Sequence, residues 1–248
     1  MNPIKIIQFT DMHLPEDEKC WEGIDLRQQF RNCWKTAVTA EVSFVVLSGD
    51  IADWDGEEGA YLWLKEFLDN ETNTPYLIMS GNHDRVSEIK RIFGDTGHFK
   101  GNSLYGHLQV EGAPLYFLDT TTDITPKEQL HWIERGLKTS GPEVLFFMHH
   151  PPILTGHQFM DSLHCLQNHH ETWRVLKGID RIKNIFVGHY HYEDEIVKDG
   201  KTVYVTPSAK MQIDPTEKEF KILSVNPGWR EITWSDQGVE TRVVYLNP

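Results

Sequence analysis

The stretch Tyr76-Leu77-Ile78-Met79-Ser80-Gly81-Asn82-His83-Asp84 decides how this chain folds. Its apolar run stops at a serine and a glycine, and an amide, an imidazole and a carboxylate follow. A short apolar run bounded by glycine is typical of a buried strand. Since α/β proteins hold their chemistry in the loops at strand ends, the stretch predicts a functional rim beside a parallel strand.

Four other apolar runs end in the same way. Each run is followed by side chains with oxygen or nitrogen atoms that can bind a metal. Asp11 and His13 follow the run Ile4 to Phe9, and Asp50 follows Phe44 to Leu47. His149 and His150 follow Val144 to Met148, and His189 and His191 follow Ile185 to Val187. Because the carboxyl ends of neighbouring parallel strands meet at one edge of a sheet, we expect these donors to share one metal site.

Length, charge and cysteine content limit the class of protein. With 248 residues and a formal net charge of -13, we expect a single domain over residues 1–248 and no extended nucleic-acid surface. No apolar run approaches the roughly 20 residues that span a bilayer, so we expect no membrane partner. The three cysteines lack zinc-type spacing, and the chain enters a strand pattern almost at once, without a signal-peptide pattern. Both features predict a cytoplasmic protein.

The order of patterns predicts two kinds of architecture along the chain. Helical periodicity over 24–40 and 61–68 alternates with buried strands, which indicates right-handed parallel crossovers. Residues 103–110 and 114–118 predict a hairpin, and residues 153–182 a long loop with a helix that is our candidate lid. The part from 192 to 248 reads as antiparallel strands, including one at 219–225. We therefore expect two sheets stacked between outer helices, with C-terminal edges that could pair in a homodimer.

The donors also indicate which ions the site prefers. Asp11 and His13 stand two apart, so on an extended segment both would point to one side, and His189 and His191 repeat this spacing. Asp50 offers two oxygens that could bridge two cations about 3.5–4 Å apart. Imidazole and carboxylate without thiolate favour first-row ions such as Mn, Fe, Co or Zn.

At these residues the chain resembles the calcineurin-like metallophosphoesterase superfamily. The motifs that carry the resemblance are Asp-x-His at 11–13, Gly-Asp at 49–50, Gly-Asn-His-Asp at 81–84, His-His-Pro-Pro at 149–152 and Gly-His-x-His at 188–191. The resemblance implies a four-layer αββα sandwich of two mixed sheets with a dinuclear centre of divalent or trivalent ions. It implies one metal held by Asp11, His13, Asp50 and His191, and a second held by Asp50, Asn82, His149 and His189.

Within that superfamily the chain is most similar to the class III bacterial cyclic-nucleotide phosphodiesterases. The matching segments are Met160-Asp161, Leu166 with Asn168, Thr206-Pro207-Ser208 with Gln212, and Pro227-Gly228-Trp229-Arg230 leading to Gly238 and Thr241. The chain departs from the resemblance at Ala209-Lys210, where a polar residue followed by a small residue or cysteine is expected.

The resemblance implies hydrolysis of 3′,5′-cyclic AMP, or a related cyclic nucleotide, to the 5′-nucleotide by in-line attack of a metal-bridging hydroxide. His83 would donate to the phosphoryl oxygen or protonate the leaving alkoxide, with Asp84 orienting its ring. We expect Asn82, His83, His150 and His191 to face this small-molecule phosphodiester. For His150 two roles stay open, in support of the metal ligands or in contact with phosphate.

Two alternatives remain beside this reading. One is another small phosphate ester, such as a 2′,3′-cyclic nucleotide, a glycerophosphodiester or a phosphomonoester, because the shared core handles only the phosphate. The other is a non-catalytic scaffold of the same fold, which the complete set of ligand residues argues against. Trp54, in a loop near Asp50, could stack on a base.

Overall fold

Two mixed β-sheets form the centre of the protein in the computed structural model, which describes residues 3–137 and 140–246. The first sheet has the strand order β15-β14-β1-β2-β3, in which β1, β2 and β3 are parallel and β14 and β15 return antiparallel. Its strands are β1 (Ile4–Phe9), β2 (Phe44–Ser48), β3 (Tyr76–Met79), β14 (Gly228–Ser235) and β15 (Gly238–Tyr245).

The second sheet has the order β10-β11-β9-β8-β7-β6. Its four inner strands run parallel, and the edge strands β6 and β10 run antiparallel to their neighbours. The strands are β6 (Gly106–Val110), β7 (Ala113–Leu118), β8 (Val144–Met148), β9 (Ile182–Val187), β10 (Asp194–Lys198) and β11 (Lys201–Val205). Every residue of β8 is buried, as expected for a strand covered on both faces.

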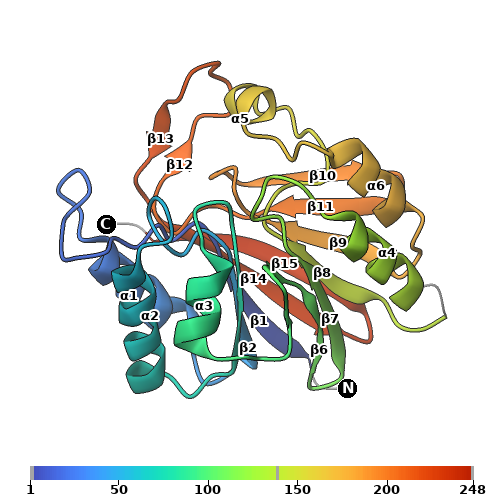
Figure 1. Ribbon diagram of the computed structural model, residues 1–248, viewed down its shortest axis with the longest axis horizontal. Coiled ribbons are helices and arrows are strands. Elements are labelled where there is room, and N and C mark those ends of the chain that lie inside the picture. The colour runs from blue at the N-terminus through green and yellow to red at the C-terminus, as the bar shows by residue number, and fades with distance from the viewer. Residues whose placement is uncertain (1–2, 138–139, 247–248) are drawn as a thin grey trace.

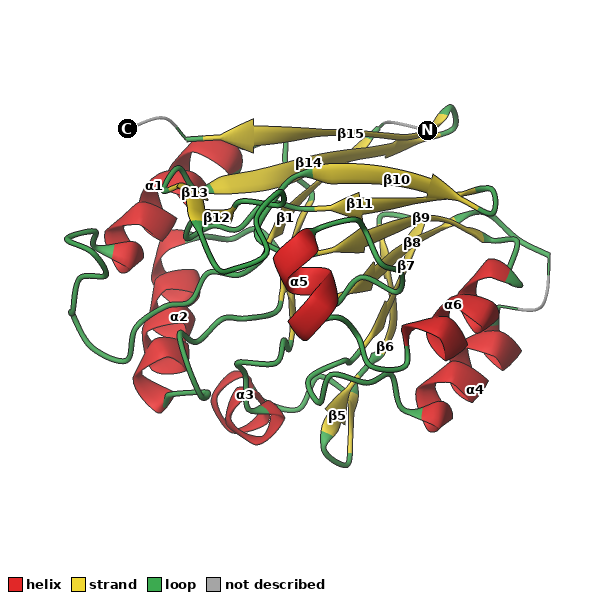
Figure 2. Ribbon diagram, turned by 90° about the horizontal axis from the view of Figure 1, so that it is seen from above, coloured by secondary structure: helices red, strands yellow, loops and turns green. Residues whose placement is uncertain are grey.

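Helices cover the outer face of each sheet, which gives the four layers (Figure 2). On the first sheet lie α1 (Leu26–Ala37), α2 (Glu58–Glu71) and α3 (Val86–Phe93), and on the second α4 (Lys127–Gly136) and α6 (His169–Lys177). In α1 the Asp25 carboxylate caps the Gln28 N–H at 2.9 Å, and the buried residues recur at helical spacing. The predicted αββα sandwich is confirmed.

Three details differ from the sequence prediction. Residues 153–182 contain two helices, because the short α5 (Gln158–Leu163) precedes α6. The strand predicted at 219–225 is limited to β13 (Ile222–Ser224), which pairs with β12 (Gln212–Ile213) in a ribbon beside α5 (Figure 1). The hairpin strand predicted to begin at residue 103 begins at Gly106, since β5 (Ser103–Leu104) pairs instead with β4 (Phe99–Lys100).

The topology brings the carboxyl ends of β1, β2, β3, β8 and β9 to one edge of the sandwich. Backbone hydrogen bonds tie the two sheets together there, such as Ala209 N–H to the Thr10 carbonyl at 3.0 Å. In the described part of the chain, no helix has both the length and the apolar character needed to cross a bilayer.

Candidate metal centre

Seven side chains that the sequence placed at a metal site come together at this edge. Asp11 and His13 follow β1, and Asp50 follows β2. Asn82 follows β3, His149 follows β8, and His189 and His191 follow β9. Six of the seven are at most 5% exposed, and Asn82 is half-buried. The ends of these five strands therefore meet in the structure, as the sequence predicts.

The backbone conformation of these residues differs from the extended conformation that the sequence predicted. Asp11 and His13 are not extended but have φ of 53° and 44°, and Asp50, His189 and His191 are also left-handed. Such backbone costs on the order of 1 kcal/mol or more per residue, so it persists only where the surroundings fix it. Here the Asp11 N–H donates to the Gly49 carbonyl and the His13 N–H to the Asp50 carbonyl, both at 3.0 Å.

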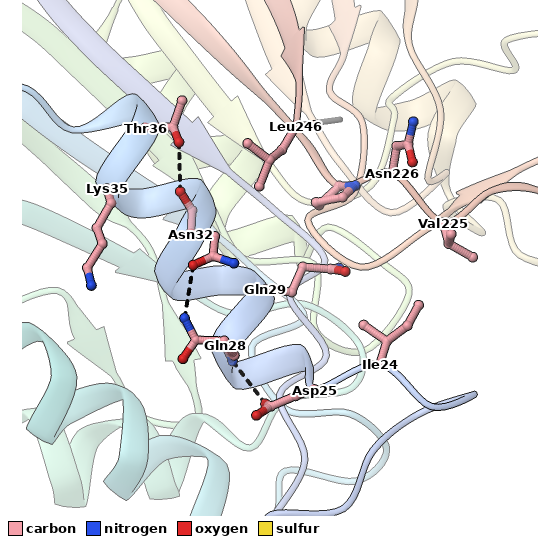
Figure 3. A pocket seen from close by; sticks show the side chains of 11 residues that line it. Ile24, Asp25, Gln28, Gln29, Asn32, Lys35, Thr36, Val225, Asn226 and Leu246 are labelled. Carbon is pink, nitrogen blue, oxygen red and sulfur yellow. Dashed lines mark hydrogen bonds between the residues drawn. The ribbon is translucent and has the colours of Figure 1, made fainter. Parts of the chain in front are cut away.

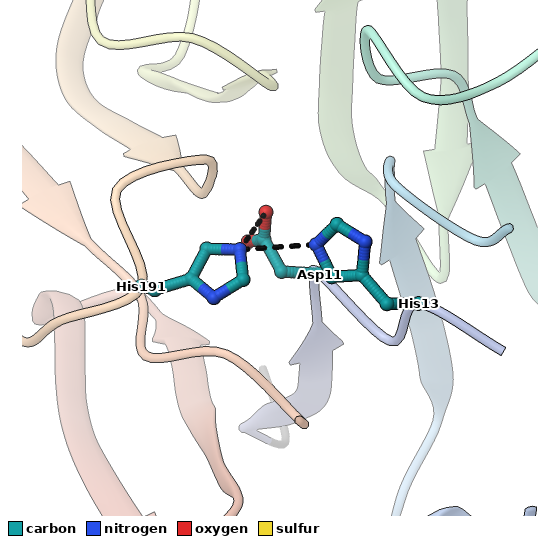
Figure 4. Close-up of side chains that lie close together, drawn as sticks. All are labelled: Asp11, His13 and His191. Carbon is teal, nitrogen blue, oxygen red and sulfur yellow. Dashed lines mark hydrogen bonds and ion pairs between the residues drawn. The ribbon is translucent and has the colours of Figure 1, made fainter. Parts of the chain in front are cut away.

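The first group of ligand atoms comprises Asp11, His13, His191 and an oxygen of Asp50. The Nε2 atoms of His13 and His191 lie 3.0 Å apart, and His191 Nε2 lies 3.3 Å from Asp11 Oδ1 (Figure 4). Asp50 Oδ2 is 3.7 Å from His13 Nε2. The ligand atoms of Asp11, His13 and His191 lie within 4.8 Å of one another, a spacing at which one cation can contact all three, and Asp50 joins the group through its approach to His13.

The second group shares Asp50 with the first. His149 Nε2 lies 3.3 Å from Asp50 Oδ2, and atoms of Asp50, His149 and His189 gather within 4.8 Å of one another. The Asn82 Oδ1 atom and His149 Nε2 are buried without a hydrogen-bond partner among the described residues. Buried donors and acceptors are normally paired, so these two atoms indicate a ligand position.

Each of the four histidines among the predicted metal ligands has one ring nitrogen within hydrogen-bond distance of a backbone carbonyl. The Nδ1 atoms of His13, His149 and His191 lie 3.2, 3.0 and 3.1 Å from the carbonyls of Asp53, Ser48 and Met211, and His189 Nε2 lies 2.8 Å from that of His164. A carbonyl only accepts, so each of these nitrogens must carry the proton. In the neutral ring the other nitrogen then presents its lone pair to the cluster, as metal-binding histidines do.

The charges of the cluster fit the same role. Burial opposes ionisation of Asp11 and Asp50, but His191 and His149 lower the pKa of Asp11, and His149 and His13 hold the pKa of Asp50 well below its usual range. Burial lowers the pKa of His13 to about 3 and puts that of His189 well below its usual range. The carboxylates are therefore charged and these two imidazoles neutral, which are the forms that bind cations.

The pKa of His149 shows how strongly the cluster favours positive charge. Burial disfavours its charged form, yet the carboxylates of Asp50 and Asp11 raise its pKa to about 9. The pocket thus attracts positive charge at this position. The lone pairs of His13 and His191, 3.0 Å apart, also need a cation between them, so the residues present fit a pair of first-row metal ions.

Two glycines in the motifs are required by close approach of side chains. A Cβ atom on Gly81 would lie 2.2 Å from Asp50 Oδ1, and one on Gly188 would lie 2.0 Å from Thr10 Oγ1. The glycines before Asn82 and His189 therefore leave room for the carboxylates of the cluster.

His83 lies beside the cluster and lines the open side of the site. Its ring centre is 4.9 Å from that of His13 and 5.9 Å from that of Trp54, and its backbone N–H donates to Asp50 Oδ1 at 3.0 Å. Its Nδ1 atom is buried without a partner among the described residues. A ring nitrogen of His83 also lies within 4.8 Å of ligand atoms of His13 and Asp50, so His83 stands between the cluster and the cleft.

Asp84 has partners other than the one expected from the sequence. Its carboxylate accepts the N–H groups of Ile51, Ala52 and Gly81 at 2.9 to 3.2 Å and the Tyr61 hydroxyl at 2.9 Å. No hydrogen bond joins it to the His83 ring in the described structure. Asp84 thus fixes the loops after β2 and β3 and does not orient the imidazole.

His150 has both ring nitrogens occupied by protein partners. Its Nδ1 lies 2.8 Å from Thr120 Oγ1, and its Nε2 lies 3.2 Å from Asp123 Oδ1. The ring is fully buried and its centre is 4.0 Å from that of His189. Of the two roles left open for His150, this placement favours support of His189 over contact with phosphate.

A cleft of about 680 Å³ opens in front of the cluster. Beside the site residues it is lined by aromatic and aliphatic side chains with a few charged ones, namely Trp21, Glu22, Asp53, Trp54, Phe159, Met160, His164, Lys210, Met211, Ile213, Phe220 and Ile222. Sequence reasoning missed Trp21 and Phe159, which carry no motif. It noted Lys210 only as a departure from the resemblance.

Only the first part of the predicted lid borders this cleft. α5 and His164 line it, and the His164 carbonyl holds His189, whereas α6 buries Trp173 and Leu176 against the second sheet. Another hollow of about 730 Å³ lies between α1 and residues 225–227 and contains none of the predicted site residues (Figure 3). Its polar side chains Asp25, Gln28 and Asn32 bond within the helix, so it offers no comparable chemistry.

The comparisons with known proteins agree with this geometry. The model of a family described as calcineurin-like phosphoesterase matches residues 4–193. A "Probable cyclic nucleotide phosphodiesterase" of Fibrobacter succinogenes is 36% identical over 98% of this chain and 94% of its own length. The "3′,5′-cyclic adenosine monophosphate phosphodiesterase CpdA" of Vibrio vulnificus is 28% identical over 98% and 90%. A dimetal phosphatase from Danio rerio has the same fold, with a TM-score of 0.67, 13% identity and coverage of 98% and 99%.

Proposed function

The chain belongs to the calcineurin-like phosphoesterase family, and from this premise we propose that it hydrolyses 3′,5′-cyclic AMP, or a related cyclic nucleotide, to the 5′-nucleotide. Membership makes it a hydrolase of the metallophosphoesterase class. The choice of a cyclic nucleotide as the substrate is supported by the names of the two relatives.

The observation that carries the proposal is the set of four histidines His13, His149, His189 and His191, each of which is oriented by a carbonyl through one ring nitrogen and directs the other into the cluster. We propose that Asp11, His13, Asp50 and His191 hold one ion and that Asp50, Asn82, His149 and His189 hold a second, both from Mn, Fe, Co and Zn. When bound, such ions neutralise phosphate charge and activate water at neutral pH.

The chain's own residues supply the remaining steps. His83 borders both the cluster and the cleft, which supports a role for its imidazole as the donor of a proton to the departing ribose oxygen of a cyclic nucleotide. The apolar and aromatic side chains of the cleft would exclude water from the nucleoside part and orient it. A ribose alkoxide is a poor leaving group, which is why this reaction needs a positioned acid.

Two further expectations stay with the proposal. Cys20, Cys33 and Cys165 are free thiols, which supports a cytoplasmic location. The edge strand β15 is eight residues long and offers a surface on which a homodimer could form.

The experiment is hydrolysis of 3′,5′-cyclic AMP by protein that has been stripped of metal and then titrated with Mn²⁺, with products separated by chromatography. We expect 5′-AMP to form only after metal is added. 2′,3′-cyclic AMP, a glycerophosphodiester and bis(p-nitrophenyl) phosphate are assayed beside it, and cyclic AMP turned over no better than the generic diester would refute the nucleotide assignment. Absence of turnover on all four would favour a scaffold.

A further inference from the structure

Lys210 places an ammonium group at the wall of the cleft. The residue is only 7% exposed, and its Nζ lies 2.5 Å from Asp53 Oδ1 and 4.9 Å from the centre of the Trp21 ring. Asp53 belongs to the loop after β2, 157 positions away in the sequence. The ion pair therefore joins two loops that are otherwise separate in the chain.

Each of these two loops also supplies a carbonyl to a predicted metal ligand. The Asp53 carbonyl accepts from His13 Nδ1 at 3.2 Å, and the Met211 carbonyl, one residue beyond Lys210, accepts from His191 Nδ1 at 3.1 Å. The two rings converge with their Nε2 atoms 3.0 Å apart. The distance between the two carbonyls thus controls how the two imidazoles meet.

Burial makes this pair stronger than an ordinary surface pair. The Lys210 side chain is 9% exposed and that of Asp53 36%, so solvent screens the charges less than at the protein surface. The backbone at Lys210 is fixed independently, because its N–H donates to Ser208 Oγ at 2.8 Å and its carbonyl accepts from Gln29 Nε2 at 2.9 Å. The side chain is then what ties the fixed loop to Asp53.

The two histidines that belong only to the second group lack this connection. His149 is oriented by the Ser48 carbonyl and His189 by the His164 carbonyl, neither of which lies on the loops that Lys210 joins. Loss of the ion pair should therefore act on one group of ligands and spare the other.

We propose that the Lys210–Asp53 ion pair is a positioning device for the first group: it holds the carbonyls of Asp53 and Met211 so that His13 and His191 point at the same cation. The inference rests on the proposed metal-binding role of the cluster and does not depend on the substrate. Outer partners of this kind typically change metal affinity by 10- to 100-fold.

The test is a titration of the metal-stripped protein with Mn²⁺, in which electron paramagnetic resonance measures the concentration of free Mn²⁺ at each step. In Lys210→Met we expect one of the two affinities to fall 10- to 100-fold and the other to stay at the wild-type value. Asp53→Asn keeps the shape of the side chain and should give the same result if Lys210→Met fails to fold. Lys210→Arg should recover part of the loss.

Two controls make the result specific. Lys65→Met removes the exposed Lys65–Asp69 pair of α2 and should leave both affinities unchanged. Added to His191→Asn, Lys210→Met should cause little further loss, whereas added to His189→Asn it should still weaken the remaining ion. Wild-type affinities in Lys210→Met and Asp53→Asn, or an equal fall of both affinities, would overturn the proposal. A wild-type protein that binds two ions but leaves cyclic AMP intact would refute only the proposed substrate.

Discussion

Asp50 is the residue on which both groups of ligands depend. Its Oδ2 lies near His13 on one side and His149 on the other, and its Oδ1 accepts the His83 N–H. Asp50→Asn keeps the volume but removes the charge that two cations would share, so we expect both ions to be lost. Metal content after gel filtration, measured by mass spectrometry, checks this. Asp69→Asn on α2 is the control, and one tightly held ion in Asp50→Asn would contradict the shared role.

Trp54 is 76% exposed and lines the cleft beside His83. An indole left in solvent at this place is suited to stacking on a base, which is worth about 1–3 kcal/mol. For Trp54→Ala we expect KM for cyclic AMP to rise about tenfold with kcat unchanged, and no change with a glycerophosphodiester that has no ring. Leu62→Ala, at an exposed position of α2, is the matched control. An equal loss on both substrates would show that Trp54 only supports the loop.

His83 can be tested through the leaving group. If its ring protonates the departing oxygen, His83→Asn should lower kcat on cyclic AMP by about 10²- to 10⁴-fold. The loss should be much smaller on bis(p-nitrophenyl) phosphate, because p-nitrophenolate leaves without a proton. Steady-state kinetics with both substrates, at full metal occupancy, check this. A similar loss on both would instead assign His83 to charge stabilisation or to metal binding.

At the scale of elements, the segment before and within α5 is held by one carboxylate. Asp161 accepts the N–H groups of Thr155 and Gly156 at 3.1 and 2.6 Å and the Tyr190 hydroxyl at 2.8 Å. Tyr190 lies between His189 and His191, so this carboxylate links the candidate lid to the ligand loop.

Asp161→Asn replaces one acceptor oxygen by an N–H donor and should loosen residues 153–164. We expect amide hydrogen exchange there to become about tenfold faster, with β8 unchanged, since a lost hydrogen bond to a charged group costs about 1.5–3 kcal/mol. Asp180→Asn, at an exposed position, is the control. Faster exchange spread evenly over the chain would mean that Asp161 stabilises the whole fold and not the lid segment.

At the scale of the whole molecule, a buried polar network joins the two sheets. Thr206, just after β11, donates to Gln8 Oε1 at 2.7 Å and accepts from Arg230 Nε at 3.0 Å, while Gln8 lies on β1 and Arg230 on β14. Arg230 is 4% exposed, and burial lowers its pKa to about 10. The cost of burying this charge is offset only while its partners remain.

Thr206→Val leaves groups of Gln8 and Arg230 without their partner, so we expect the free energy of unfolding to fall by about 2–4 kcal/mol. Urea denaturation measures this, and Thr233→Val on β14 is the control. Because we expect a single domain, we also expect the wild-type protein to unfold in a single transition. Two separate transitions would contradict it, and a loss in Thr206→Val no larger than in the control would contradict the role of the network.

The sequence by itself determined the order of the main strands and helices of the sandwich and the identity of the metal-ligand candidates. Apolar runs that end in Gly81, Gly188 or the His149-His150 pair are local signals, because burial on both faces and turn chemistry act within a few residues. The resemblance built on these motifs implied the αββα sandwich, which the structure confirms.

Only the tertiary structure decided which groups each side chain meets. The left-handed backbone of Asp11 and His13, the amides around Asp84, the partners of His150 and the pairing of Lys210 with Asp53 all arise from segments far apart in the chain. Hydrogen bonds and ion pairs depend on distances of a few ångströms, which follow from how the two sheets pack and not from the spacing of residues along the chain.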